Sequence, residues 1–426
     1  QLHEIHDQLG IARHYARFAT RITAPYEAPL LTHEALTKMM TAPQRTAMLE
    51  CALDVWGRKG EVRFPEITRP EPAPIDADLI EAAAKLLGGA KKPLIVVGGG
   101  AQDASKEIIQ LAEMLQAPVC GFRRGRGVMP SSNYLSVTIP VGNRLWKEAD
   151  VVLAVGTRLH MQTTQWGTDA NLKVVRIDAD PEALERGYKP AVAIPGDAAT
   201  CAAALLAKVP AHNSRRASRK EEMAGHAAWL AEKLEKVQPQ WGWLKAIRKA
   251  LPPEGIFVDE VTQAGFTARV GFPVEGPRTF LSPGYQDNLG WGYGTALGVK
   301  TARPDVPVVA ITGDGGFGFQ LGELATAALH DIGVISVIFD NQGYGNVKRL
   351  QEEKFAGRHI ACDLMSPDFV RLAENFGIAG LRANSPAELE SCLRKALTIK
   401  GPVLIHVPHN ETASPWELIR LPKVRG

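Results

Sequence analysis

Two short polar segments, 313–316 (Gly-Asp-Gly-Gly) and 340–343 (Asp-Asn-Gln-Gly), constrain the fold of this chain more than any other feature. Each follows an apolar run of strand length, 308–312 or 334–339, and a helix-like segment, 319–330, separates the two runs. Two buried strands joined by a helix predict a parallel β-α-β unit. Because ligands of open α/β sheets bind where parallel strands end, the two polar segments are expected to lie together at that sheet edge.

Apolar runs alternate with helix-like segments along most of the chain. This alternation predicts an α/β fold class, with successive doubly wound parallel-sheet domains. In the middle of the chain the expected strands are 93–97, 118–121, 151–155 and 174–177, and the expected helices are 79–87, 105–115, 141–148 and 198–207. Nearer the end, the expected strands are 256–259, 308–312, 334–339 and 403–407.

Residues 1–64 do not look like a complete domain. Helix-like segments at 2–22 and 32–40 and a single strand candidate at 46–53 cannot form a sheet-based domain, so we expect the end of a domain that begins upstream. Proline-rich and charged stretches indicate two linkers. The expected organisation is 1–64 as a domain remnant, 65–77 as a linker, 78–210 as a Rossmann-like central domain, 211–236 as a linker, 237–410 as the domain of the two polar segments, and 411–426 as a tail.

The composition is that of a soluble globular protein and gives no sign that the chain binds nucleic acid or a membrane. The chain has 426 residues, 45% hydrophobic and 22% charged, with a net charge of +3. So small a charge gives no reason to expect nucleic acid or a membrane as a partner. No apolar run approaches the roughly 18 residues of a membrane span. Five dispersed cysteines without a CxxC pair are typical of reduced thiols, which favours a cytoplasmic location.

The two polar segments carry the groups that a hard cation and a diphosphate need. The carboxylate of Asp314, the amide oxygen of Asn341 and the backbone carbonyl of Gly343 would supply three oxygen ligands to Mg²⁺, with diphosphate oxygens and water completing six. Glycines in 313–316 let the backbone approach an anion closely, and the N-terminus of the following helix attracts phosphate. Each segment alone is also typical of a simple turn, so the interpretation depends on finding both together.

This pair of segments resembles the diphosphate and metal motif of thiamine-diphosphate enzymes, in which an Asn lies 27 positions after the Asp, here 314 to 341. The nearest likeness is to the acetolactate synthase-like branch of 2-oxo acid decarboxylases and carboligases. Residues 289–294 and 298–304 resemble the segment before that family's metal site. The middle of the chain resembles its central domain, and 1–64 resembles the last part of its pyrimidine-binding domain.

The resemblance implies roles for particular residues. Asp314, Asn341 and Gly343 would hold Mg²⁺, and Leu289 would press the aminopyrimidine of the bent cofactor toward the thiazolium carbon. Without the resemblance, Leu289 is better explained as a core residue. The expected cofactor-binding residues are Gly313, Asp314, Gly315, Gly316, Asn341, Gly343, Tyr344, Gly345, Leu289 and Gln263.

The activity that the resemblance implies is C–C bond cleavage or formation on a small 2-oxo acid, by a lyase or transferase that requires thiamine diphosphate and Mg²⁺. Family members take an activating Glu from the N-terminal domain of a neighbouring subunit, so a homodimer or homotetramer is expected, and the Glu is expected upstream of Gln1. Two departures leave acetolactate formation open beside other decarboxylase, lyase or carboligase reactions. Arg349-Leu350 stands where acetolactate synthases usually carry Gln-Trp, and 262–266 replaces their Gly-Gln-His-Gln-Met run.

Two other functions stay open. Residues 98–100 (Gly-Gly-Gly) follow an apolar strand like a nucleotide-binding turn, but they do not form GxGxxG. With Asp178 on a ribose and Arg124, Arg126 or Arg158 on phosphate, the central domain would bind FAD or ADP. A nucleotide-dependent oxidoreductase is therefore one alternative, and a non-catalytic cofactor-binding subunit is the other.

Overall fold

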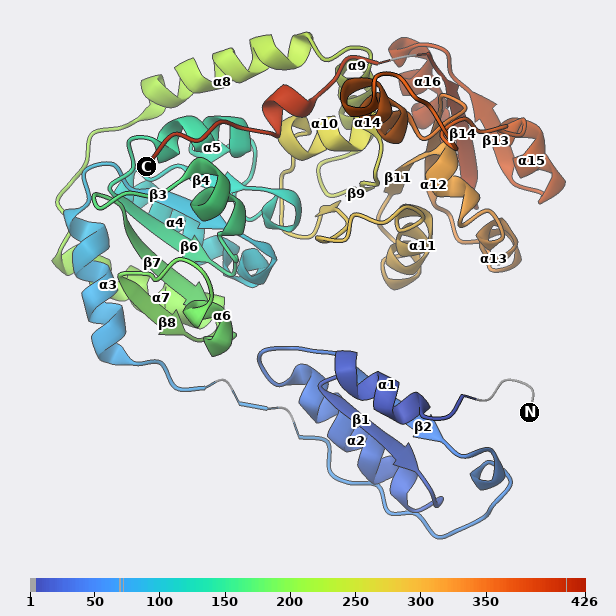
Figure 1. Ribbon diagram of the computed structural model, residues 1–426, viewed down its shortest axis with the longest axis horizontal. Coiled ribbons are helices and arrows are strands. Elements are labelled where there is room, and N and C mark those ends of the chain that lie inside the picture. Colours follow the sequence, from blue (N-terminus) through green and yellow to red (C-terminus); the bar gives the residue numbers. More distant parts are fainter. Residues whose placement is uncertain (1–4, 69, 72, 411) are drawn as a thin grey trace.

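The computed structural model describes residues 5–68, 70–71, 73–410 and 412–426, which form three α/β units. The units follow one another along the chain, and the C-terminal tail returns from the third unit to the second (Figure 1). The predicted α/β class with parallel sheets is confirmed. The expected linker and tail include Arg69, Pro72 and residue 411, which, like 1–4, lie outside the described residues.

The first unit has two parallel strands. Its elements are α1 (Gln8–Tyr15), β1 (Phe18–Ile22), α2 (Glu27–Met40), β2 (Ala47–Cys51) and the 3-10 turn η1 (Leu53–Val55). The helix expected over 2–22 is therefore wrong from residue 16 onward, and the expectation of a single strand is wrong too. Phe18 pairs with Ala47 and Ile22 with Cys51. The local sequence pattern of this segment suits a helix or a strand, and these long-range pairings make it a strand.

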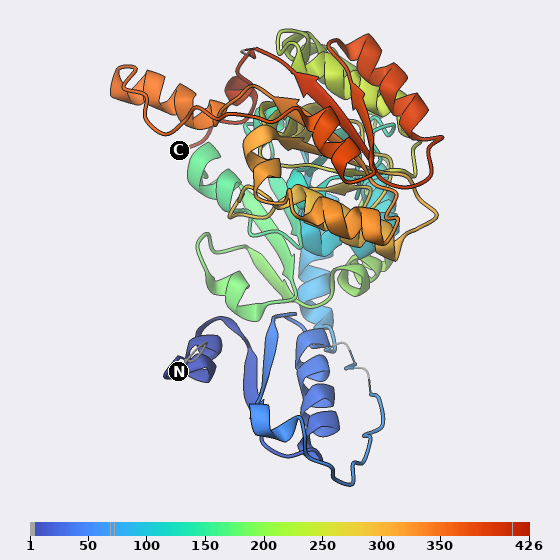
Figure 2. The same cartoon turned by 90° about the vertical axis from the view of Figure 1, so that its right-hand side faces the viewer.

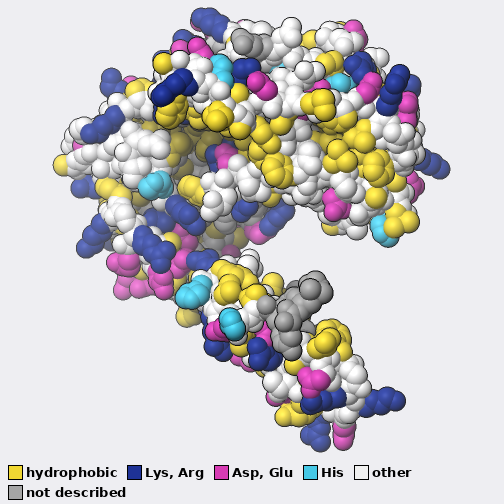
Figure 3. Space-filling view, turned by 45° about the vertical axis from the view of Figure 1, so that its right-hand side comes forward, with side chains coloured by type: hydrophobic (Ala, Val, Ile, Leu, Met, Phe, Trp, Pro, Cys, Tyr) yellow, Lys and Arg dark blue, Asp and Glu magenta, His cyan; other side chains and the backbone are white. Residues whose placement is uncertain are grey.

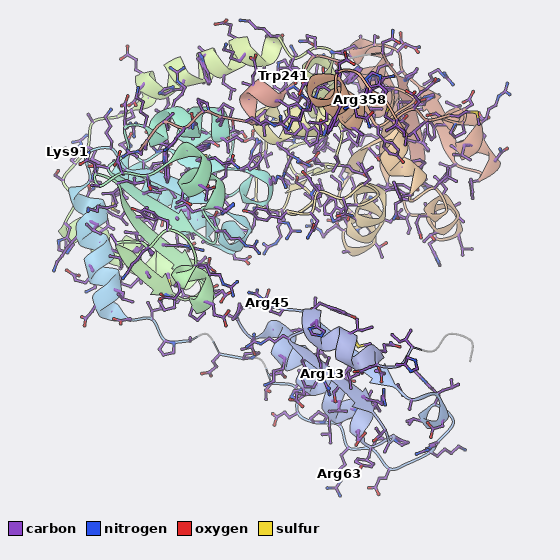
Figure 4. The ribbon with its side chains drawn as sticks, viewed as in Figure 1. Arg13, Arg45, Arg63, Lys91, Trp241 and Arg358 are labelled. Atoms are coloured by element: carbon purple, nitrogen blue, oxygen red, sulfur yellow. The ribbon has the colours of Figure 1, made fainter. Side chains whose placement is uncertain are left out.

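The first unit meets the rest of the molecule over a small area. It is joined to the central domain by an extended segment, and Figure 2 shows it standing below the other two units. The guanidinium of Arg45, at its end nearest the central domain (Figure 4), donates a 2.6 Å hydrogen bond to the carboxylate of Asp180. This ion pair links the two units across their boundary.

The central domain has six parallel strands in the order β5-β4-β3-β6-β7-β8. The four predicted strands are present, and two short edge strands, β5 and β8, were not predicted. Its elements are α3 (Ala77–Gly89), β3 (Leu94–Val97), η2 (Gly99–Ala104), α4 (Ser105–Leu115), β4 (Val119–Gly121), η3 (Arg123–Gly125), β5 (Ser136–Val137), α5 (Ile139–Trp146), β6 (Val151–Val155), η4 (Gln162–Trp166), β7 (Lys173–Asp178), α6 (Pro181–Glu185), β8 (Val192–Pro195), α7 (Ala198–Lys208) and η5 (Val209–Ala211).

The central core explains why these strands were easy to predict. Every residue of β3 and β6 is buried, because helices cover both faces of the sheet. Helix α4 presents one apolar face to that sheet through Ile108, Leu111 and Leu115, and the side chain of Asp76 caps the start of α3. Continuous apolar runs and amphipathic helices are the direct consequence of this layered packing.

The segment 211–236, expected to be a linker, contains the helix α8 (Lys220–Glu235). The helix runs along one side of the molecule between the central and third units (Figure 1). Only Met223 and Leu234 are buried in it, and Arg144 of α5 lies 4.4 Å from the ring centroid of Trp229. Its many Lys, Glu and Ala residues are good helix formers, which the linker prediction underestimated. No helix in the described residues is both long and apolar enough to cross a membrane.

The third unit has six parallel strands in the order β10-β9-β11-β12-β14-β13. The helix expected over 319–330 is the shorter helix α13, and an additional short helix, α12, begins at Asp314 directly after β11. The elements are α9 (Gln240–Ala250), β9 (Ile256–Val258), α10 (Gln263–Gly271), β10 (Phe280–Leu281), α11 (Gly292–Ala302), β11 (Val308–Gly313), α12 (Asp314–Gly318), α13 (Glu323–Leu329), β12 (Ile335–Asp340), α14 (Gly345–Phe355), α15 (Phe369–Asn375), β13 (Ala379–Arg382), α16 (Pro386–Ala396), β14 (Val403–Pro408) and η6 (Trp416–Leu418).

The central and third units are fastened together by direct hydrogen bonds. The backbone N–H of Ser131 donates to the carbonyl of Val274 at 2.8 Å, and the hydroxyl of Thr138 donates to the carbonyl of Val270 at 2.9 Å. The tail adds a second link, because the N–H of Arg425 donates to a carbonyl of the central domain. The end of α10 and the loop before β10 are therefore packed against the central domain.

Candidate functional site

The two polar segments meet at the carboxyl edge of the third sheet. Strands β11 and β12 are parallel neighbours, with Gly313 opposite Phe339, so the residues that follow them emerge side by side. The backbone N–H of Gly343 donates a 2.9 Å hydrogen bond to Oδ2 of Asp314. The structure thus brings together the three residues expected to bind a cation.

A cleft of about 180 Å³ lies at this edge, and all the residues expected to bind the cofactor line it. Its walls also contain aromatic and apolar side chains that were not predicted. The lining residues are Trp243, Val261, Thr262, Gln263, Ala264, Phe266, Leu289, Gly313, Asp314, Gly315, Gly316, Phe339, Asn341, Gly343, Tyr344, Gly345, Asn346, Val347 and His409.

Asp314 is a carboxylate in a place that suits a cation. Its side chain is 6% exposed and lies near the carboxylate of Asp340. Burial, together with the nearby negative charge of Asp340, raises the pKa of Asp314. The hydroxyl of Ser366 donates to Asp340 at 2.8 Å and lies 3.3 Å from Asp314, so it connects the two carboxylates. A divalent cation would relieve the repulsion between them.

Asp340 is held by a histidine on the neighbouring strand. Nε2 of His406 lies 2.9 Å from Oδ2 of Asp340, and both residues are buried. Burial would raise the pKa of Asp340, but hydrogen bonds from His406 and Ser366 lower it below its usual value. The pairing of β12 with β14 brings these residues together, and only the strand order could have revealed it.

The floor of the cleft is packed too tightly for side chains. A Cβ at Gly316 would lie 2.4 Å from Oε1 of Glu260, and one at Gly315 would lie 2.6 Å from the ring of Tyr344. Glu260 is fully buried and accepts hydrogen bonds from the N–H of Gly290 at 2.6 Å and of Gly292 at 3.2 Å. Sequence reasoning missed Glu260, whose type and position gave no signal beyond a strand end.

Gly316→Ala is expected to lower the free energy of unfolding by about 1–3 kcal/mol, because the added methyl group overpacks the buried carboxylate of Glu260. Gly318→Ala is the matched control, since a Cβ at Gly318 meets no atom within 4 Å in the same short helix. Thermal and urea unfolding of both variants measure the difference. Equal stability of the two variants would contradict this account of the floor.

The other predicted residues line the walls. Leu289 is half-buried in the loop before α11, and Gln263 is the first residue of α10. Oε1 of Gln263 is buried and has no hydrogen-bond partner among the described residues. Helix α14 begins at Gly345 without a side-chain cap, and although the N–H of Gly345 donates to the carbonyl of Gly343, the next two N–H groups have no acceptor among the described residues and are available to an anion.

A larger polar cavity of about 760 Å³ adjoins the cleft. The two share Gln263, Asn341 and His409, so a molecule in one is within reach of the other. The imidazole of His409 packs 5.0 Å from the ring of Trp243, and burial lowers its pKa. The cavity also contains Lys348, which pairs with a carboxylate at 3.0 Å. This arrangement offers space for a polar substrate beside the cofactor residues.

The central domain does not present its predicted phosphate ligands in one place. Arg126 is buried and directs its guanidinium to backbone carbonyls of the third unit, while Arg158 lies 5.0 Å from the ring centroid of Tyr285. A Cβ at Gly98 would lie 2.3 Å from the carbonyl of Gly156, so this glycine is required for close packing of two turns. These contacts give no support to a bound FAD or ADP.

Two family models match the chain. Residues 260–407 match the model described as thiamine pyrophosphate enzyme, C-terminal TPP binding domain. Residues 80–205 match the model described as thiamine pyrophosphate enzyme, central domain. The matches cover the strands β3 to β8 of the central unit and most of the third unit, from just after β9 into β14.

Several curated proteins are similar in sequence. Acetolactate synthase large subunit of Haemophilus influenzae is 31% identical over 360 residues, which span 80% of this chain and 63% of that protein. A probable sulfoacetaldehyde acetyltransferase of Rhizobium meliloti is 30% identical, with 92% of this chain and 73% of that protein covered. A probable 2-ketoarginine decarboxylase of Pseudomonas aeruginosa is 29% identical, with 96% and 74% covered. The chain therefore spans about three fifths to three quarters of the length of these relatives.

One solved structure extends the likeness to the whole described fold. Benzoylformate decarboxylase from Polynucleobacter necessarius superposes with a TM-score of 0.79 and covers 97% of this chain and 80% of its own. Its sequence identity is 20%, so it supports the fold alone.

Proposed function

Because the chain belongs to the thiamine pyrophosphate enzyme family, we propose that it acts with thiamine diphosphate and Mg²⁺ to cleave or form a C–C bond of a 2-oxo acid. One observation carries the proposal: Asp314, Asn341 and Gly343 lie together at two adjacent strand ends, joined by the 2.9 Å hydrogen bond from Gly343 to Asp314. Relatives named as acetolactate synthase and as 2-ketoarginine decarboxylase support the substrate class.

The residues of the cleft fit the cofactor. The oxygens of Asp314, Asn341 and Gly343 would hold Mg²⁺, and the N-termini of α10 and α14 would face the diphosphate. Glycines 315 and 316 let Tyr344 and Glu260 pack directly against the floor of the cleft, and Leu289 would support the rings. When bound, thiamine diphosphate supplies a carbon nucleophile and an electron sink.

The apolar walls of the cleft would also limit the access of water to the substrate. Stacked aromatic rings of Trp243 and Phe339, 4.6 Å apart between centroids, form one side, and Phe266 and Leu289 add apolar surface. These side chains would exclude water from the substrate carboxylate and favour its loss as CO₂. The polar cavity on the other side would admit the substrate and release the product.

We expect the full-length protein, with the activating Glu expected upstream of Gln1 and with thiamine diphosphate and Mg²⁺ supplied, to release CO₂ from a panel of 2-oxo acids that includes pyruvate, and to lose this activity when Mg²⁺ is chelated. The measurement is CO₂ release with product identification. A change in nicotinamide absorbance without CO₂ release would favour the oxidoreductase alternative. Tight binding of thiamine diphosphate without turnover of any 2-oxo acid would favour a non-catalytic subunit.

The proposal includes a homodimer or homotetramer in the cytoplasm. Large apolar side chains are exposed on the third unit, and groups of apolar side chains are visible on the face in Figure 3. Surfaces of this kind mark protein interfaces. The exposed side chains are Tyr285, Phe319, Leu329, Val347, Phe355, Ile360 and Met365. The molecular mass measured by light scattering tests the assembly, and a monomer at micromolar concentration would contradict it.

A further inference from the structure

The loop that carries Leu289 is held from the central domain by an arginine. Arg123, in the turn after β4, donates from Nη1 to the carbonyl of Gly284 at 2.9 Å and from Nη2 to Oδ2 of Asp287 at 2.8 Å. Figure 1 shows the chain between β9 and α11 on the side of the third unit that faces the central domain. Residues 284 and 287 begin the stretch that ends at the cofactor cleft.

The loop needs this support because its backbone is strained. Asp287 has a φ of 51°, in the left-handed region that costs a residue other than glycine free energy. Its N–H closes a turn onto the carbonyl of Gly284 at 3.2 Å. On the other side of Leu289, the N–H of Gly290 donates to the buried carboxylate of Glu260. Leu289 thus lies between two anchored points.

The carboxylate of Asp287 also joins the loop to the opposite wall of the cleft. Asp287 accepts two hydrogen bonds from Arg269 of α10, at 2.9 and 2.8 Å, and Arg269 also donates to Asp259 at 2.8 Å. Helix α10 begins at Gln263, which lines the cleft. Through Asp287, Arg123 is connected to both the Leu289 loop and the helix that faces it.

Arg126 holds the far end of the same helix. It is 5% exposed, and its guanidinium donates to the carbonyl of Arg269 at 2.8 Å and to that of Phe272. A cation at a helix C-terminus satisfies its free carbonyls and complements the helix dipole. The two arginines of one central-domain turn therefore fix α10 and the loop together.

We propose that Arg123 is a positioning residue that, through Asp287 and Gly284, holds Leu289 in place for the rings of the cofactor. The proposal rests on the function proposed above. It gives the central domain a role in cofactor binding that requires no nucleotide, since its arginines act on the third unit. Arg123 touches neither the strand ends nor the cation ligands, so its effect should be confined to the ring end of the site.

Arg123 is a suitable residue to replace. Its side chain is 27% exposed, and Asp287 keeps both hydrogen bonds from Arg269 when Arg123 is removed. No buried carboxylate is left alone, so the variant is expected to fold. Arg215 provides a control, because it is an exposed arginine in the segment after η5 and makes no side-chain hydrogen bond with the described residues.

The test compares the full-length protein with its variants Arg123→Ala, Arg123→Lys and Arg215→Ala. Calorimetry with Mg²⁺ present measures the affinity for thiamine diphosphate and, separately, for inorganic pyrophosphate. Hydrogen exchange measures the protection of 284–290 in the cofactor-free protein. We expect Arg123→Ala to weaken thiamine diphosphate binding about tenfold, the effect of one charged hydrogen-bond pair. We expect faster exchange in the loop and unchanged pyrophosphate affinity.

Arg215→Ala should match the wild type in all three measurements, and Arg123→Lys should restore part of the affinity because it keeps one donor. Unchanged thiamine diphosphate affinity in Arg123→Ala would overturn the positioning role, as would an equal loss for pyrophosphate. A full-length wild-type protein that binds pyrophosphate with Mg²⁺ but not thiamine diphosphate would instead contradict the proposed function, whatever Arg123 does.

Discussion

Asp314→Ala is expected to abolish Mg²⁺-dependent binding of thiamine diphosphate. The substitution removes the only carboxylate among the three proposed cation ligands and the acceptor of the Gly343 N–H. Loss of an outer partner of a metal ligand already costs about 10- to 100-fold in affinity, so loss of a direct ligand should cost at least about a hundredfold. Trp243 lines the same cleft, and its fluorescence offers a direct titration signal.

The control for this variant is Asp305→Ala, which removes an exposed carboxylate outside the cleft. A second control is the stability of the cofactor-free protein. Removal of Asp314 relieves its repulsion with Asp340 but leaves the N–H of Gly343 without its acceptor, so the two effects oppose each other and the thermal midpoint should change little. Wild-type affinity in Asp314→Ala would contradict the proposed cation site, and a lost signal with a much lower midpoint would point to misfolding instead.

The strands that could be predicted are those whose residues are buried on both faces. All five residues of β6 are buried and apolar, and β11 and β12 show the same pattern until their polar ends. Burial in a parallel sheet gives a continuous apolar run, and that run is visible without any partner. The two-residue strand β10 and the half-exposed β13 give no such run.

Long-range pairing explains the other differences from prediction. In β1, Phe18, Thr20 and Ile22 alternate with Ala19 and Arg21, and upstream helix formers make the whole segment look helical. Its pairing with β2 decides the outcome, and no local pattern contains that information. Helix α8 was missed for the opposite reason, because its composition is helical but only two of its residues reach the core.

The candidate site also contains residues that could be predicted from the sequence and residues that could not. Its glycines and polar residues were predictable because a rule of sheet topology places them at one edge. The groups that hold them were not, since Ser366 and His406 meet Asp314 or Asp340 only after distant strands and loops are assembled. Arg126 shows the converse error, because a buried arginine that caps a helix looks the same in sequence as one that binds phosphate.

Arg269→Met is expected to have the largest effect on stability, lowering the free energy of unfolding by about 3–5 kcal/mol. Arg269 is 1% exposed and pairs with Asp259, which is fully buried, and with Asp287. Burial raises the pKa of Asp259, and the charge of Arg269 opposes that rise, so its removal leaves a buried carboxylate without compensation. Urea unfolding measures the loss.

Two further variants make this prediction specific. Arg278→Met breaks an ion pair with Asp103 whose side chains are both largely exposed, so its cost should be no more than about 1 kcal/mol. Arg269→Met combined with Asp259→Asn should recover part of the stability, because the second change removes the unpaired charge. A cost of Arg269→Met no larger than that of Arg278→Met would contradict this account of the buried ion pair.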